Sequence, residues 1–369
     1  QSVFQKMSYP EKGTVLGPIK VIPQEYPHIS CRSIDILVSL RTDKRRLARA
    51  LLTECISGNS DTVIAYRENT RYVQAFEPVR LDHPRSYQAN PFGDSSPLLK
   101  ENGVYLITGG LGGIGLTLAA YLAKTAQARL ALISRSEFPP RETWDRLLAS
   151  HNNDPIRNKI LRIREIEAAG GAVMILNADV SDEAQMQDAV SRVTDRFGEI
   201  NIGIHAAGLP DGAMIQRRTR EMSEAVFSSK LTGTLVLTRL LKDAGADLVV
   251  LCSSLASIAD RSLGQVAYCA ANAFLDLLSH YSLNAIAIPS ISINWDTWQE
   301  VGMAVEAIKK FSHVAEPDGL SHGLLPDEGA EAYARILHHE FSQVAVSSKD
   351  LAVRIQKSIK PEPFQPFLC

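Results

Sequence analysis

A glycine-rich loop between an apolar strand and a helix constrains this chain more than any other feature. The segment Val104–Thr108 is rich in β-forming residues, five of the seven positions Gly109–Gly115 are glycine, and a helical pattern continues to about Thr125. Glycines adopt backbone conformations that other residues avoid and let amide groups approach a phosphate closely. A helix that begins directly after such a loop adds partial positive charge there. A tight structural turn is the alternative, but the order of strand, glycine loop and helix predicts a dinucleotide-binding loop.

Beyond this loop, apolar strand-like segments alternate with helical patterns. The predicted strands are Val104–Thr108, Leu130–Ile133, Ala172–Leu176, Ile202–His205, Leu248–Cys252, Ile291–Asn294 and Val344–Ser347. Helices are predicted between them, among others over Glu183–Phe197, Ser223–Leu241 and Val266–Leu278. Near-continuous apolar strands that alternate with helices are typical of a parallel sheet covered on both faces. The sequence therefore predicts an α/β fold with a Rossmann-type doubly wound parallel sheet.

The first part of the chain has a different pattern. A strand is predicted over Cys31–Leu40, a helix over Lys44–Cys55, and a hairpin from Thr62–Tyr66 and Tyr72–Phe76. The segment Ser86–Glu101 is dense in turn-forming residues, which is typical of a linker. We therefore expect a smaller N-terminal unit over residues 1–98 and a nucleotide-binding unit over residues 99–369. The N-terminal unit has no glycine loop, and we assign no chemistry to it.

Composition excludes several classes of function. Apolar residues make up 45% of the chain and charged residues 22%, close to ordinary globular values, and the formal net charge is −2. These values do not favour binding to nucleic acid or to an anionic membrane. The five cysteines form no C-x-x-C pair, and no histidine pair completes a zinc pattern, so no metal site is expected. Sparse cysteines fit a reducing compartment, and we expect a cytoplasmic protein.

The ends of the second and third strands bear on the kind of dinucleotide. An NAD-selective site usually has an acidic residue after the second strand, whereas this chain has Ser134 and Arg135. A hydroxyl and a guanidinium suit a 2′-phosphate, so we expect NADPH; the alternative is a solvated arginine. After the third strand, Asp179 either accepts a hydrogen bond from the adenine amine or caps the helix that begins near Asp182.

Four polar residues follow the glycine loop in the order Lys230, Ser254, Tyr268 and Asn272. With Thr108-Gly109, Gly113-Ile114-Gly115 and His205-Ala206-Ala207-Gly208, this order resembles the short-chain dehydrogenase/reductase superfamily. The usual Tyr-x-x-x-Lys is absent, because Asn272 stands where that lysine would be and Lys230 lies upstream. This exchange resembles the ketoreductase domains of modular polyketide synthases and animal-type fatty acid synthases. In such domains a structural subdomain comes first, and the stretch Leu16–Leu81 is similar to its latter half, as a truncated, degenerate Rossmann-like unit.

The chemistry of ketone reduction agrees with these residue types. Tyr268 would give a proton to the developing alkoxide, and Lys230 is the cation expected to lower the pKa of that phenol. Asn272 lies one helical turn from Tyr268 and would hold Lys230 or a proton-relay water. Ser254 would donate a hydrogen bond to the carbonyl oxygen as charge grows there.

Two positions depart from the family pattern. The spacing from Ser254 to Tyr268 is one residue longer than usual, which we attribute to an insertion within Ala259–Leu263, and Ser253 is the alternative donor. One stereochemical class of the family carries Leu-Asp-Asp after the fourth strand, where this chain has Leu209-Pro210-Asp211.

The resemblance implies a substrate, a cofactor and partners. The substrate would be a 3-oxoacyl thioester carried on the phosphopantetheine of an acyl carrier protein, the product a 3-hydroxyacyl thioester and the cofactor NADPH. The partners would be that carrier protein and other domains of a polyketide synthase. The expected cofactor-binding residues are Thr108, Gly109, Gly110, Leu111, Gly112, Gly113, Ile114, Gly115, Ser134, Arg135, Asp179, Val180, Ala206, Ala207 and Gly208.

Arg217, Arg218 and Arg220 are candidates for contact with an acidic carrier protein, with a solvated helix face as the alternative. Two other functions stay in view: a free-standing short-chain reductase of small ketones, and a non-catalytic nucleotide-binding pseudo-reductase scaffold. The N-terminal segment and the exchange of Lys230 and Asn272 argue against the free-standing reductase. The intact set of four polar residues argues against the pseudo-reductase.

Overall fold

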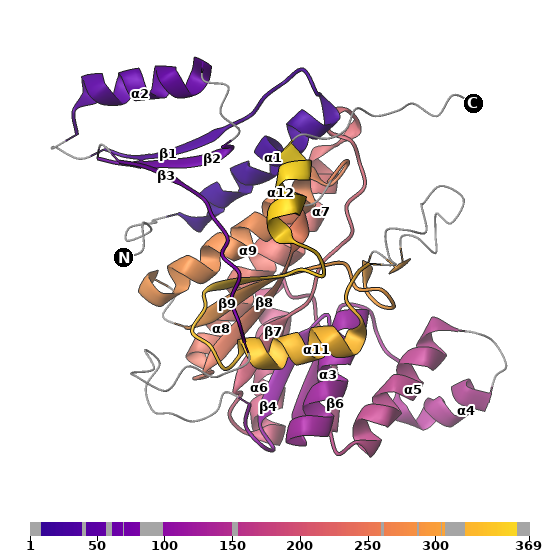
Figure 1. Ribbon diagram of the computed structural model, residues 1–369. Helices are drawn as coiled ribbons and strands as arrows, with labels where there is room; N and C mark the ends of the chain where they lie inside the picture. Colours follow the sequence, from indigo (N-terminus) through magenta and orange to yellow (C-terminus); the bar gives the residue numbers. More distant parts are fainter. Residues whose placement is uncertain are drawn as a thin grey trace, which may run out of the picture.

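Seven parallel strands form the main sheet (Figure 1). The computed structural model describes residues 9–38, 42–56, 61–68, 70–81, 99–149, 154–259, 262–285, 288–303, 305–306 and 322–359. The strand order is β10 (Gln343–Val346), β9 (Ser290–Trp295), β8 (Leu248–Ser254), β7 (Ile202–His205), β4 (Val104–Thr108), β5 (Arg129–Ser134) and β6 (Ala172–Asn177). The chain order reverses at β4, which pairs with both β5 and β7. In doubly wound sheets such a reversal opens a crevice at the carboxyl ends of the strands, where ligands bind.

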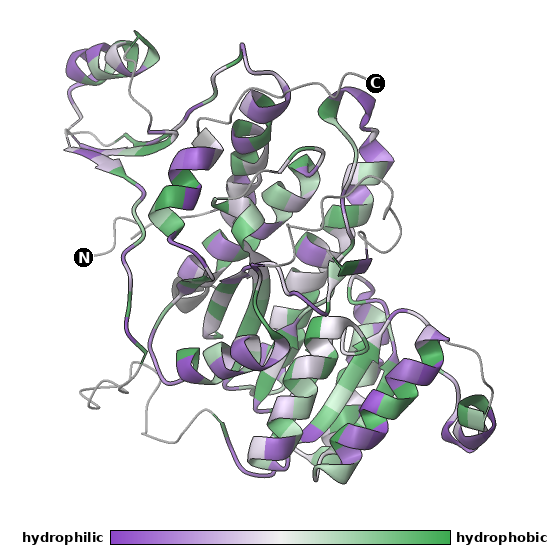
Figure 2. Ribbon diagram, turned by 45° about the vertical axis from the view of Figure 1, so that its right-hand side comes forward, coloured by the Kyte–Doolittle hydropathy of each residue, from purple (hydrophilic) through white to green (hydrophobic). Residues whose placement is uncertain are grey.

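Helices cover both faces of this sheet, as predicted for a doubly wound fold. One face packs against α3 (Gly113–Ala126), α5 (Pro155–Ala168) and α11 (Pro326–Ile336). The other packs against α6 (Glu183–Phe197), α8 (Gly233–Asp243) and α9 (Val266–Ala285). Figure 2 shows the central strands as mainly hydrophobic ribbons between helices that carry hydrophilic residues on their outer sides. Burial of the strands on both faces explains their near-continuous apolar sequences.

The helix predicted over Ser223–Leu241 is three elements in the structure. The α-helix α7 (Arg220–Phe227) leads into a π-helical turn, η4 (Ser228–Thr232), and α8 follows. The predicted range is helical throughout, but a π-helical turn interrupts its regular α-helical geometry. The Thr234 hydroxyl donates to the carbonyl oxygen of Lys230, and back-bonding of this kind competes with regular helix geometry. Single π-helical turns occur frequently at functional sites.

Short elements complete the main domain. They are η2 (Arg141–Thr143), α4 (Trp144–Ala149), η3 (Ile215–Arg217), η5 (Leu255–Ser257) and α12 (Leu351–Ile359). Within the described ranges, no helix has both the length and the apolar character needed to cross a membrane.

The N-terminal region contributes two separate pieces. One is a small sheet of β1 (Ser33–Leu37), β2 (Val63–Arg67) and β3 (Thr70–Val73), together with α2 (Lys44–Ile56). These elements correspond to the predicted strand, helix and hairpin. In Figure 1 this unit lies apart from the main sheet. By contrast, η1 (Pro10–Val15) and α1 (Leu16–Glu25), which were not predicted, pack along α9. Residues 82–98, which include most of the expected linker, lie outside the described residues.

The contact between α1 and α9 is close. A Cβ atom added at Gly17 would lie 2.5 Å from the backbone nitrogen of Ala270, so the two helices approach backbone to backbone. Val21 of α1 is fully buried in a small cluster with Val266 and Cys269 of α9, and Tyr268 packs against the same cluster. This part of the N-terminal region is therefore packed directly on the helix that carries the predicted catalytic tyrosine.

Candidate active site

The glycine loop has the geometry expected of an anion-binding turn. Gly109 has a positive φ of 66°, and a Cβ atom there would lie 2.8 Å from the backbone of Ala206 and Ala207, which follow β7. Helix α3 begins at Gly113, and no side chain of the described residues caps its N-terminus. Its first amide groups thus lack a side-chain acceptor, and amides so placed at a helix N-terminus bind phosphate. The residues present fit the pyrophosphate of a dinucleotide.

Some positions of this loop serve packing instead. The side chain of Leu111 is buried in the hydrophobic core, and a Cβ atom at Gly110 would lie 2.8 Å from Cα of Leu132 in β5. A Cβ atom at Gly113 would lie 2.6 Å from the backbone nitrogen of Gly302, so the segment after β9 lies against the start of α3. Thr108, at the end of β4, is bonded through its hydroxyl to Nδ1 of His205 at 2.7 Å.

The end of β5 is held by a neighbouring strand. The side-chain amide of Asn177 in β6 donates to the carbonyl oxygens of Ser134 (3.2 Å) and Arg135 (2.9 Å). Ser134 is half-buried and Arg135 is exposed at this edge of the sheet. The fixed turn therefore leaves the Arg135 side chain at the surface beside the carboxyl ends of β5 and β6. Sequence reasoning did not identify Asn177, because its role depends on the pairing of β6 with β5.

Asp179 follows β6 and does not cap the next helix. The α6 cap is Asp182, whose carboxylate accepts a hydrogen bond from the backbone of Gln185, so the capping interpretation of Asp179 is wrong. Asp179 instead accepts hydrogen bonds from the backbone and hydroxyl groups of Ser181. Burial raises the pKa of Asp179, but these hydrogen bonds and the charge of Arg135 lower it by a larger amount, so the net shift is downward. Asp179 is thus an anion near Arg135.

Lys230 is buried inside the molecule, although its position on the helix was ambiguous from the sequence. Its side chain is 2% exposed, and Nζ donates to the carbonyl oxygen of Cys252 in β8 at 2.9 Å. Nζ also lies 5.8 Å from the centre of the Tyr268 ring. Burial lowers the pKa of Lys230 to about 8, which still leaves the ammonium mostly protonated at neutral pH. A Cβ atom at Gly208 would lie 3.0 Å from Cε of Lys230, so the segment after β7 lies directly over it.

The hydroxyl of Tyr268 lies among the other predicted catalytic residues. Burial raises the pKa of Tyr268, while hydrogen bonding with Ser254 and Asn272 lowers it in part, and the net shift is upward. Lys230 is not among the main causes of this shift; its ammonium lies 5.8 Å from the ring centre and donates to the carbonyl oxygen of Cys252. Asn272 is fully buried and donates to the Tyr268 carbonyl oxygen at 2.9 Å, and its side-chain oxygen accepts from no donor among the described residues.

Ser253 and Ser254 point into different surroundings. Ser253 belongs to a buried network with Asn294 and Asp276: its hydroxyl accepts from Asn294 at 3.0 Å, and Asn294 also donates to Asp276 at 2.8 Å. The Ser254 hydroxyl accepts from the backbone of Ala256 and is hydrogen-bonded with Tyr268. The geometry therefore favours Ser254 over Ser253 as the group next to the tyrosine. Within the loop of the expected insertion, residues 260 and 261 lie outside the described residues.

The arginines considered for carrier-protein contact do not form one surface. Arg218 is buried in an ion pair with Asp211, with side-chain exposures of 7% and 4%. Arg220 is exposed and pairs with Glu224 one turn along α7. Arg218 is therefore not available to a partner, because its guanidinium is used inside the protein, and the prediction for this residue is wrong.

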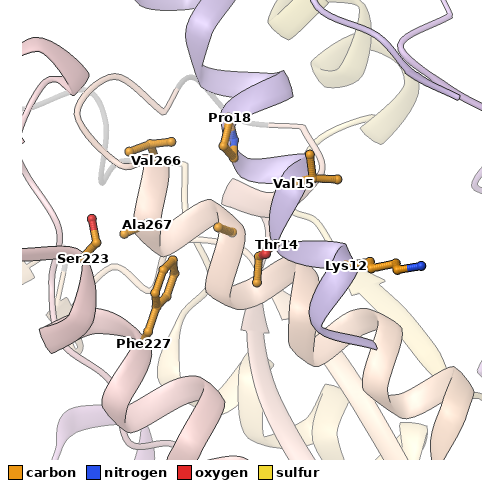
Figure 3. Close-up of a pocket in the computed structure, with 9 residues that line it drawn as sticks. Lys12, Thr14, Val15, Pro18, Ser223, Phe227, Val266 and Ala267 are labelled. Atoms are coloured by element: carbon orange, nitrogen blue, oxygen red, sulfur yellow. The ribbon is translucent and has the colours of Figure 1, made fainter. Parts of the chain in front are cut away.

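An open pocket of about 700 Å³ lies beside α9 on the side of α1. In Figure 3, Thr14, Val15 and Pro18 of η1 and α1 lie near Val266 and Ala267 of α9, with Ser223 and Phe227 of α7 on the other side. None of the four predicted catalytic residues belongs to its lining. The pocket is therefore separate from the cluster around Tyr268.

The arrangement defines a class of protein. It has the features of a short-chain dehydrogenase/reductase. These are a doubly wound parallel sheet, a glycine loop at the point where the strand order reverses, and a Ser–Tyr–Lys cluster at the carboxyl ends of β7 and β8.

Comparisons with known proteins identify the family within this class. A family model described as the KR domain matches residues 103–300. Polyketide synthase PksL of Bacillus subtilis (strain 168) is 28% identical over 341 residues, which are 89% of this chain and 7% of that protein. The 6-methylsalicylic acid synthase of Aspergillus terreus (strain NIH 2624 / FGSC A1156) is 30% identical over 295 residues, or 76% of this chain and 16% of the synthase. The chain belongs to the ketoreductase (KR) domain family of polyketide synthases, as the resemblance predicted.

A solved structure agrees. The crystal structure of an N-terminal ketoreductase from the macrolactin assembly line superposes with a TM-score of 0.69 at 26% identity, covering 95% of this chain and 63% of the other. The chain thus spans a small part of the curated synthases and under two thirds of this ketoreductase structure.

Proposed function

We propose that this protein reduces a 3-oxoacyl thioester, carried on an acyl carrier protein, to the 3-hydroxyacyl thioester with NADPH during polyketide chain elongation. The observation that carries the proposal is the meeting of Ser254, Tyr268, Lys230 and Asn272 at one place. That place lies at the same edge of the sheet as the glycine loop. A ketone bound there would be within reach of both a dinucleotide and a proton donor.

The cofactor would be held by the residues at the carboxyl ends of the central strands. The amides of the loop Gly109–Gly115 would bind the pyrophosphate, and Ser134 and Arg135 the 2′-phosphate. Asp179 with Val180 would flank the adenine, and Ala206–Gly208 would lie against the remainder of the dinucleotide. When bound, NADPH supplies the hydride for the substrate carbon.

The side chains would handle the oxygen of the ketone. The hydroxyls of Ser254 and Tyr268 would donate hydrogen bonds to the carbonyl oxygen, and these bonds strengthen as negative charge develops on it. A tyrosine whose pKa is raised by burial stays protonated at neutral pH and so is ready to transfer its proton to that oxygen. The phenolate left behind would be stabilised by the Lys230 ammonium, 5.8 Å from the ring centre.

Asn272 would connect these two groups. Its side-chain nitrogen is bonded to the Tyr268 carbonyl oxygen, which fixes the amide plane. Its buried oxygen is then directed away from that bond and would accept a hydrogen bond from a relay water or from Lys230. Its role would be to hold a proton path open behind the tyrosine.

The relatives are large synthases of which this chain matches 7% and 16%, and this favours a substrate delivered by a carrier protein over a free small ketone. We assign residues 99–369 to the catalytic unit and residues 1–98 to a structural unit with its linker. The intact cluster around Tyr268 argues against a pseudo-reductase scaffold.

Oxidation of NADPH by the purified chain, with a 3-oxoacyl N-acetylcysteamine thioester as substrate, tests the proposal. The wild type should turn over, and Tyr268→Phe should lose at least about 100-fold in kcat while still binding NADPH. The same assay with a simple cyclic ketone separates the free-standing reductase, which would prefer the small ketone. No turnover with either substrate would favour the scaffold.

A further inference from the structure

A buried ion pair caps the helix that carries Tyr268. One carboxylate oxygen of Asp211 accepts hydrogen bonds from the backbone amides of Ala267 and Tyr268, both at 3.1 Å. The other oxygen is paired with Arg218. Since α9 begins at Val266, these amides are among the first in the helix and have no acceptor within it. The carboxylate thus satisfies them and complements the positive end of the helix.

Arg218 extends this contact to the loop that precedes α9. Its guanidinium also donates to the carbonyl oxygens of Ala213 (3.1 Å) and Gly264 (3.2 Å). The segment after β7 and the segment before α9 are therefore joined through one buried side chain. The pair is almost fully removed from water, so loss of one partner would leave the other charge buried and unpaired. Such a loss strongly destabilises a protein, so the pair holds the two segments together.

A residue of the N-terminal region joins the same two segments. The carboxylate of Glu25, at the end of α1, accepts from the backbone amide of Ile215 at 2.7 Å and from that of Gly264 at 3.0 Å. Glu25 and Ile215 are 190 residues apart in the sequence. The neighbouring Gln24 accepts from the amide of Ser262 at 2.7 Å. The end of α1 thus provides acceptors for three loop amides around the start of α9.

We propose that Glu25, Asp211 and Arg218 form a positioning cluster that fixes the first turn of α9 and with it the hydroxyl of Tyr268. The N-terminal helix α1 then takes part in the reduction by holding the loops around the active site. This inference rests on the proposed role of Tyr268 as proton donor.

The position of Tyr268 in its helix explains why such a cluster would matter. Tyr268 is the third residue of α9, and the first turn of a helix frays unless its amides are satisfied. Proton transfer and hydrogen bonding to a substrate oxygen are impaired when the donor hydroxyl is displaced by about 1 Å. Loss of the cluster should therefore lower the rate of the chemical step more than it lowers the binding of NADPH.

The test uses Glu25→Ala, because Glu25 is half-buried at a helix end and its loss leaves the Asp211–Arg218 pair in place. Glu25→Gln keeps one acceptor oxygen and should lie between wild type and Glu25→Ala. Glu11→Ala is the matched control: it removes the same charge from an exposed position in η1 of the same region. Each full-length variant is assayed for kcat, KM and the NADPH dissociation constant, and for hydrogen exchange of the amides in residues 262–269.

We expect Glu25→Ala to lower kcat about ten-fold with NADPH binding unchanged, and to speed amide exchange at Gly264 and in the first turn of α9. Glu11→Ala should leave both unchanged. Unchanged exchange in Glu25→Ala, or faster exchange with an unchanged kcat per folded enzyme, overturns the positioning role. An active Tyr268→Phe enzyme identifies a different failure, that of the proposed proton donor, while the exchange measurement still decides whether Glu25 holds the helix.

Discussion

Removal of the buried charge of Lys230 should change how stability depends on pH. Burial lowers the pKa of Lys230 from 10.5 to about 8, so the folded protein holds this proton less tightly than the unfolded chain. Between about pH 8 and 10.5 the unfolded state therefore binds more protons, and the free energy of unfolding rises with pH. At 1.36 kcal/mol for each unit of pKa, the rise amounts to about 3 kcal/mol.

Lys230→Met removes the charge and keeps an apolar chain of similar length. Relative to this variant, the wild type should gain about 3 kcal/mol of unfolding free energy from pH 7.5 to 10.5, because groups common to both proteins cancel. The lost bond to Cys252 adds a difference that does not depend on this titration. Urea unfolding of the cofactor-free proteins across this pH range measures the effect.

Lys242→Met is the control, because Lys242 is exposed in the last turn of α8 and its ammonium stays in water in both states. Its stability difference from wild type should not vary with pH in this way. A wild-type advantage over Lys230→Met that is constant from pH 7.5 to 10.5 would refute the reasoning. It would show that the ammonium is not desolvated in the fold.

Three further predictions concern the active site. Ser254→Ala should lower kcat by about 100-fold and Ser253→Ala far less, because of the two serines only Ser254 is hydrogen-bonded with Tyr268. Steady-state kinetics in which Ser253→Ala is the slower enzyme would contradict this assignment. Arg135→Ala should weaken NADPH binding about ten-fold and leave NADH binding nearly unchanged, as measured by fluorescence titration; equal weakening of both argues against a 2′-phosphate contact. Lys230→Met should lower kcat. It should also remove the loss of activity that we expect of the wild type as pH rises through about 8, where Lys230 loses its proton. A pH–rate profile with the same alkaline limb in both proteins excludes Lys230 from the reaction.

The strands and the glycine loop could be predicted from the sequence because local pattern determines them. Val104–Thr108, Glu183–Phe197 and Ile202–His205 have the predicted bounds, since apolar strands buried on both faces and strongly amphipathic helices leave clear periodicities. The same holds for the glycine loop, whose residue types are required by backbone conformation and close approach. Helix α1 was missed because its burial depends on packing against α9 rather than on its own pattern.

The tertiary structure decided which polar side chains act together. Residue order predicted that Ser254, Tyr268 and Asn272 belong to one site, and the fold brings them together at the end of β8. The side chain of Lys230 points into the protein from a π-helical turn, which the residue pattern did not predict. The assignment of Arg218 to the surface failed because its partner, Asp211, is recognisable only once the two loops meet.

The sequence by itself determined the class of fold and the residue types of the chemistry, because both depend on patterns between near neighbours in the chain. Only the tertiary structure decided how burial and long-range contacts tune those residues. It raises the pKa of Tyr268, lowers that of Lys230, and brings Glu25 to Gly264 across most of the chain. Desolvation and contact between distant segments are properties of the packed molecule, and a linear pattern does not contain them.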